Sequence, residues 1–93
     1  MLLVSYDISN DKLRTQFSKF LEHYGHRLQY SVFELRNSKR VMNNVMAEIE
    51  KKFKPRFTGT DSVVIIPITP ADRKHIVRYG YAKHSESDVV IFG

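Results

Sequence analysis

Cysteine and tryptophan are absent from this 93-residue sequence, and glycine and proline are scarce, with four and three residues. Without cysteine, the chain has no disulfide, no thiolate nucleophile and no cysteine-ligated zinc, and it gives no sign of an oxidising compartment. A composition of 42% hydrophobic and 27% charged residues is typical of a globular protein rather than of a disordered one. We therefore expect one cytoplasmic domain over residues 1–93.

Long apolar runs and several catalytic motifs are also missing. The apolar start of the chain is interrupted by Asp7, so we expect neither a signal peptide nor a membrane span. The sequence contains no G-x-S-x-G, no Walker A loop and no G-x-G-x-x-G, which disfavours serine hydrolases, P-loop NTPases and dinucleotide enzymes. The four histidines are not spaced as a zinc site would require.

Basic residues exceed acidic ones, at fifteen to ten, which gives a net charge of +5. Such an excess favours polyanionic partners such as nucleic acid. Solvated lysine faces produce the same excess in many proteins, so charge alone leaves nucleic-acid binding open.

The hydrophobic pattern predicts alternating strands and helices. The expected segments are a strand at 2–6, a helix from Ser9 or Asn10 to Gly25, a strand region at 27–35 with a turn near Tyr30 and Ser31, a helix from 37 to 53, and a strand at 63–66 that looks buried on both faces. This order predicts an α+β ferredoxin-like β-α-β-β-α-β fold. In the tail, residues 71–79 are expected to form a helical turn or two and 89–92 an additional C-terminal strand.

Two helices can cover only one face of such a sheet, while the central strands look apolar on both faces. The uncovered face needs a partner, and a second copy of the chain is the simplest one. We therefore expect a homodimer packed through its sheets. The C-terminal segment 80–93 is expected to add a strand to the partner's sheet edge, through the partner-binding residues Val89, Val90, Ile91 and Phe92.

Asp7 is the first candidate for chemistry, because a carboxylate at the end of a buried strand contributes little to packing. It equally suits the positive end of the following helix, so a purely structural role stays open. In a homodimer, two copies of Asp7 could share one Mg²⁺ ion near the two-fold axis, and that ion could activate water for phosphodiester hydrolysis. Five basic residues form a candidate phosphate track, with a solvated surface as the alternative: Lys12, Arg14, Arg27, Lys39 and Arg40.

Three segments of the sequence, at 4–14, 24–34 and 61–68, together form a specific pattern. They read VSYDISNDKLR, YGHRLQYSVFE and DSVVIIPI, and in spacing and identity they resemble the CRISPR-associated Cas-two family. The resemblance implies a ferredoxin-like homodimer that helps the CRISPR integrase Cas-one to acquire spacers, bridging two integrase dimers and holding duplex DNA. It departs from many members at Leu13 and Gln16, where they carry a denser arginine cluster.

Members of that family have also been described as Mg²⁺-dependent endonucleases of RNA or DNA. The resemblance then implies a metal at Asp7 and further catalytic positions at Tyr6, Arg14, Arg27 and Phe33. A third reading is an RNA-binding module of RRM type that stacks bases on sheet aromatics such as Tyr6, Tyr30 and Phe33, although 27–33 lacks its glycine-containing motif. We favour the non-catalytic adaptor, because one carboxylate per chain is sparse for a nuclease.

Overall fold

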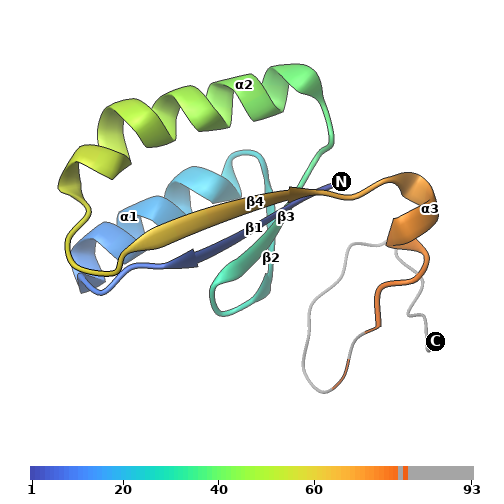
Figure 1. Ribbon diagram of the computed structural model, residues 1–93, viewed down its shortest axis with the longest axis horizontal. Coiled ribbons are helices and arrows are strands. Elements are labelled where there is room, and N and C mark those ends of the chain that lie inside the picture. The colour runs from blue at the N-terminus through green and yellow to red at the C-terminus, as the bar shows by residue number, and fades with distance from the viewer. Residues whose placement is uncertain (78, 80–93) are drawn as a thin grey trace.

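The computed structural model describes residues 1–77 and 79. Its elements are β1 (Leu2–Asp7), α1 (Asp11–Glu22), β2 (Gly25–Gln29), β3 (Val32–Leu35), α2 (Lys39–Glu48), β4 (Ser62–Pro67) and α3 (Pro70–Arg73). The strands form one sheet in the order β2-β3-β1-β4, with each neighbouring pair antiparallel. Helices α1 and α2 lie on the same face of this sheet (Figure 1). The predicted ferredoxin-like fold is confirmed.

Both long helices begin at side-chain caps, close to where the sequence predicted their starts. The Asn10 side chain accepts a hydrogen bond from the Leu13 N–H at 2.8 Å, and the Ser38 hydroxyl accepts one from Val41 at 3.2 Å. These bonds satisfy backbone donors that the first turn of a helix leaves unpaired. Beyond α2 the chain continues through a π-helical turn, Ile49–Phe53, and a 3-10 turn, Lys54–Arg56.

Gly25 has a different role from the helix stop that the sequence suggested. Helix α1 already ends at Glu22, and Gly25 is the first residue of β2. A Cβ atom at this position would lie 1.9 Å from the backbone oxygen of Glu34. Glycine is therefore needed here because β2 and β3 approach each other too closely for a side chain.

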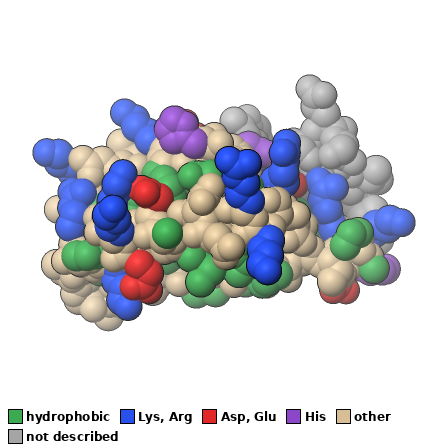
Figure 2. Space-filling model, turned by 90° about the horizontal axis from the view of Figure 1, so that it is seen from above, with side chains coloured by type: hydrophobic (Ala, Val, Ile, Leu, Met, Phe, Trp, Pro, Cys, Tyr) green, Lys and Arg blue, Asp and Glu red, His purple; other side chains and the backbone are tan. Residues whose placement is uncertain are grey.

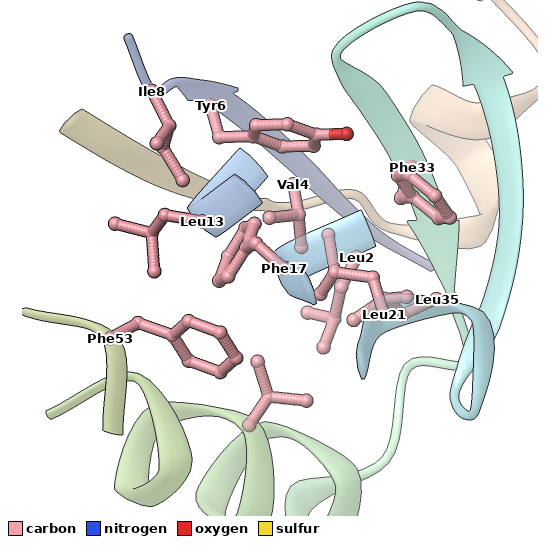
Figure 3. Packing of buried hydrophobic residues seen from close by; sticks show 11 residues of the cluster. Leu2, Val4, Tyr6, Ile8, Leu13, Phe17, Leu21, Phe33, Leu35 and Phe53 are labelled. Carbon is pink, nitrogen blue, oxygen red and sulfur yellow. The ribbon is translucent and has the colours of Figure 1, made fainter. Parts of the chain in front are cut away.

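Aromatic rings join the helices to the sheet in the core. Phe17 of α1 packs edge-on against Tyr6 of β1 and against Phe53, with ring centroids 5.0 and 4.9 Å apart. Figure 3 shows these rings beside the aliphatic side chains of β1 and β3. Offset and edge-to-face pairs of this kind add to the burial energy of the rings.

The opposite face of the sheet is only partly covered. Val64 and Ile66 of β4 are 51% and 44% exposed, and they lie in register with Ser5 and Leu3 of β1. Val63 and Ile65 alternate with them and pack against the core. The expectation that this strand is buried on both faces is therefore wrong for a single chain, whose helices cover only one face.

The segment after β4 returns to the start of β1. The Met1 amino group donates to the Ile68 carbonyl at 2.9 Å, and Arg73 of α3 forms an ion pair with Glu34 of β3 at 3.0 Å. Helix α3 agrees with the predicted helical turn.

The predicted strand at Val89, Val90, Ile91 and Phe92, and the proposed crossing of 80–93 to a partner, lie outside the described residues. Within 1–77 and 79, no helix is long and apolar enough to cross a membrane.

Candidate functional site

Asp7 lies at the end of β1 and is exposed. It is in register with Ser62 of β4 and follows Ser5 on the partly covered face of the sheet. The open groove beside it has a volume of about 400 Å³ and is lined by Ser5, Tyr6, Asp7, Ile8, Arg14, Tyr30, Ser31, Ser62 and Val64. A carboxylate, a guanidinium and an exposed aromatic ring thus share one groove.

Tyr6, the neighbour of Asp7, points to the other side of the sheet and is buried. In Figure 3 its hydroxyl is directed toward the β2–β3 hairpin, where it donates a long hydrogen bond to the Tyr30 carbonyl at 3.4 Å. Burial raises the pKa of Tyr6, because the charged form loses its hydration. The phenol therefore stays protonated at neutral pH and acts as a donor inside the wall of the groove.

Arg14 reaches back from α1 to the chain that follows β1. It donates to the Ile8 carbonyl at 3.0 Å and forms an ion pair with Asp11. The hydrogen bond that Arg14 donates to the Asp11 carboxylate is the main cause that raises the pKa of Arg14, so its charge is permanent. Its Cζ atom lies 5.9 Å from the centroid of the Tyr30 ring.

Arg27 belongs to the β2–β3 hairpin, in strand β2. It donates to the Tyr30 carbonyl at 2.7 Å, and its Cζ atom lies 5.0 Å from the centre of the Phe33 ring. A smaller hollow of about 220 Å³ is lined by Tyr6, Arg14, Thr15, Ser18, Arg27 and Tyr30. Phe33 is fully buried, so it supports Arg27 from below and offers no surface to a ligand.

The remaining predicted basic residues lie in two places. Lys12 is exposed in the first turn of α1, at the Asp7 end of the sheet. Lys39 and Arg40 begin α2, directly after β3, at the opposite end of the molecule (Figure 1). The structure thus brings Tyr6, Asp7, Arg14 and Arg27 around two adjoining hollows, whereas Lys12 lines neither of them and Lys39 and Arg40 lie apart.

Side-chain charges on the helix-covered side are mixed. Figure 2 shows Lys and Arg side chains spread over this side with acidic groups between them. Lys52 pairs with Glu48 at 2.9 Å and Lys54 with Glu50 at 3.6 Å. Exposed pairs of this kind contribute little to stability, and they reduce the positive charge that a polyanion would meet on α2.

From the sequence, Tyr30 was considered only as a base-stacking aromatic of an RRM-type module, and Asp61 was given no role. Tyr30 lies between β2 and β3 and accepts hydrogen bonds through its carbonyl from both Tyr6 and Arg27. Asp61 accepts from the N–H and hydroxyl of Ser9, each at 3.0 Å, and from the Thr58 N–H at 2.9 Å. The place of Tyr30 in a hairpin turn was visible in the sequence, whereas the contact between Asp61 and Ser9 depends on the fold.

The donors around Asp7 bear on a possible metal ion. Within the part of the chain that the structure describes, no three His, Cys, Asp or Glu side chains lie together. Asp7 is the carboxylate of its groove, where the other oxygen side chains are Tyr6, Tyr30 and three serines, Ser5, Ser31 and Ser62. Mg²⁺ binds through one or two carboxylates and keeps several waters, so this donor set fits the ion where two copies each supply Asp7.

The comparisons with known proteins agree on one family. The family model described as CRISPR associated protein Cas2 matches residues 1–76. Two relatives carry the name CRISPR-associated endoribonuclease Cas2 3. The one from Chloroflexus aurantiacus is 35% identical over 84% of this chain and 81% of its own length, and the one from Synechocystis sp. is 33% identical over 74% and 72%.

A solved structure supports the fold independently. The crystal structure of Streptococcus pyogenes Cas2 superimposes with a TM-score of 0.70, at 20% identity, over 85% of this chain and 98% of that one. The family match covers β1 to α3 and includes Asp7, Arg14 and Arg27. The chain therefore belongs to the CRISPR associated protein Cas2 family, which is the Cas-two family that the sequence resembles.

Proposed function

We propose that the protein is a homodimeric adaptor in CRISPR adaptation. In this role it bridges dimers of the integrase Cas-one in the cytoplasm and holds duplex DNA while a new spacer is acquired. Membership of the Cas2 family supports the proposal. The observation that carries it is the partly covered sheet face, on which Val64 and Ile66 remain exposed, with Val64 in the same groove as Asp7.

The exposed apolar side chains of this face are better explained by contact with a second copy of the chain than by contact with water. Exposed valine and isoleucine on a sheet gain free energy when another apolar surface covers them. A two-fold axis through the face would place the same residues of each copy against each other. Two Asp7 carboxylates would then approach, and a divalent cation between them would relieve their repulsion.

The charge of the protein supports binding of a long polyanion. A net charge of +5 per chain doubles in a dimer, and basic residues lie at both ends of the fold, with Lys12 and Arg14 near Asp7 and Lys39 and Arg40 at the start of α2. Duplex DNA presents phosphates along its whole length, so separated basic groups can contact it together. Contacts of this kind do not require chemistry at Asp7.

A second candidate is a Mg²⁺-dependent endonuclease of RNA or DNA, because both relatives described above are named endoribonucleases. The site would contain one Mg²⁺ per dimer, which activates water when bound. Asp7 of each copy would hold that ion, while Arg14 would approach a phosphate. Tyr6 and Phe33 are buried, so in this reading they position Arg27 and the hairpin.

An isosteric change of Asp7 separates the two candidates. We would compare wild type with Asp7→Asn, and with Glu22→Gln as the control, since Glu22 is an exposed carboxylate at the far end of α1. Each protein is assayed with the integrase for spacer integration and, in parallel, for Mg²⁺-dependent cleavage of RNA and duplex DNA. Sedimentation confirms that each variant has the oligomeric state of wild type.

The adaptor predicts that Asp7→Asn integrates spacers as well as wild type and Glu22→Gln, whether or not cleavage is seen. If Asp7 chemistry is needed for integration, Asp7→Asn should instead integrate spacers about 100-fold or more slowly, which is the usual effect of removing a group that takes part in chemistry. Such a loss of integration, in a variant that still binds DNA and the integrase, would contradict the adaptor.

A further inference from the structure

Tyr30 has a hydrogen-bonded backbone and a solvent-exposed ring. It lies between β2 and β3, and its carbonyl accepts hydrogen bonds from Arg27 at 2.7 Å and from the Tyr6 hydroxyl at 3.4 Å. The next carbonyl, of Ser31, accepts from the Tyr6 N–H at 3.1 Å. The Tyr30 residue is nevertheless 70% exposed. The hairpin thus holds an aromatic ring out into solvent at a defined position.

Two guanidinium groups lie close to this residue. The Arg14 guanidinium carbon is 5.9 Å from the ring centroid, and Arg27 binds the carbonyl of the same residue. The two hollows of about 400 and 220 Å³ both include Tyr6, Arg14 and Tyr30 in their walls. An exposed aromatic ring with guanidinium groups close by suits single-stranded nucleic acid, with the base on the ring and phosphates on the arginines.

The other aromatic residues of this region cannot serve as stacking surfaces. Tyr6 and Phe33 are 4% and 0% exposed, and the helices cover the face of the sheet from which they project. Stacking on buried sheet aromatics, as an RRM would require, is therefore excluded for these two residues. Tyr30 is the aromatic side chain of the groove that a base can reach.

We propose that the Tyr30 ring stacks on an unpaired nucleobase of single-stranded RNA or DNA, while Arg14 and Arg27 bind the phosphates beside that base. The base must be unpaired, because both faces of a base inside a duplex are already covered by its neighbours. This inference rests on the nucleic-acid binding proposed above and adds a single-stranded contact to it. It needs no chemistry at Asp7.

The test measures the affinity of the full chain for labelled single-stranded RNA, single-stranded DNA, and a blunt duplex of the same sequence. The variants are Tyr30→Ala, which removes the ring, and Tyr30→Phe, which keeps it. Both leave the backbone contacts of residue 30 with Arg27 and Tyr6 in place. We expect Tyr30→Ala to weaken single-strand binding about 10-fold and Tyr30→Phe less than about twofold, since base stacking on an aromatic ring typically has an effect of that order.

The duplex and the oligomeric state provide the controls. Affinity for the duplex should be unchanged in both variants, and RNA and DNA arms show which strand the site prefers. Equal losses for single strand and duplex, or no loss for Tyr30→Ala, would overturn the inference. So would dissociation of the Tyr30→Ala dimer, which would make the ring an interface residue. Wild type that binds the duplex but no single strand defeats this inference alone, whereas wild type that binds neither also defeats the proposed function.

Discussion

Asp61 shows how a single side chain fixes the geometry beside Asp7. One of its carboxylate oxygens binds the N–H and hydroxyl of Ser9, and the other binds the Thr58 N–H. The Ile8 carbonyl, next to Ser9, accepts the hydrogen bond from Arg14. Asp61 therefore holds the segment after β1 in the position where it can receive Arg14.

These hydrogen bonds make Asp61 sensitive to acid. The backbone N–H of Thr58, and after it that of Ser9, lowers the pKa of Asp61 below its usual value of 3.8. A carboxylate with a lowered pKa in the folded state stabilises the protein above its unfolded pKa, and this contribution is lost as the pH falls through the folded value. The loss from Asp61 therefore begins below about pH 4.

We predict that Asp61→Asn is less stable than wild type at neutral pH and loses less of its stability below about pH 4. The asparagine amide can accept from Ser9 or from Thr58 but must turn its NH₂ toward the other N–H. Urea unfolding at a series of pH values, at one protein concentration, measures both effects. Parallel stability curves for wild type and the variant would show that Asp61 has no such role.

Chemical type and position were enough to find some of these residues and not others. Asp7, Arg14 and Arg27 are polar residues at the ends or edges of predicted elements, so the sequence indicated them directly. The RRM-type reading grouped Tyr30 with Tyr6 and Phe33, and only the structure shows that Tyr30 alone of the three is exposed. No local pattern links Asp61 to Ser9, because 52 residues separate them and only the pairing of β1 with β4 brings them together.

The β2–β3 hairpin depends on close backbone packing where it meets the end of α1. Gly25 pairs with Leu35 in the sheet, and the Glu34 carbonyl lies where a Cβ of residue 25 would be. Backbone atoms cannot move aside as the end of a flexible side chain can. A methyl group at this position must therefore push the two strands apart.

We predict that Gly25→Ala lowers the free energy of unfolding by about 3 kcal/mol, the upper part of the usual range for overpacking. Gly59→Ala is the matched control, since Gly59 has a φ of +57° but open space around a Cβ. It should lose only about 1 kcal/mol, from backbone strain alone. Urea unfolding of both variants at equal concentration tests this order, and equal losses would contradict it.

The sequence predicted where helices and turns begin better than it predicted which of their side chains are buried. The helix start near Asn10, the second helix start near residue 37 and the turn near Tyr30 and Ser31 follow from local chemistry, and the structure confirms them. Met46 shares the helical spacing of the apolar residues in 37–53, yet it is 46% exposed. Helical spacing gives the direction of a stripe, but the width of its buried part depends on what packs against it.

At the scale of the whole molecule, the central question is what covers the second face of the sheet. The sequence pattern of an apolar run such as 63–66 is the same whether the second face of the strand packs against helices of its own chain or against another molecule. In the single chain, Val64 and Ile66 remain exposed on that face. The homodimer is the assembly on which the adaptor and any metal shared between two Asp7 side chains both depend.

Sedimentation of wild type, Val64→Glu and Ala47→Glu at micromolar concentration tests this homodimer most directly. Ala47 is exposed on α2, on the side of the molecule away from the open sheet face, so it receives the same charge outside the proposed interface. We predict dimers for wild type and Ala47→Glu, and at least about 10-fold weaker association for Val64→Glu, because a buried unpaired carboxylate is costly. A monomeric wild type, or a Val64→Glu dimer as tight as wild type, would contradict the account.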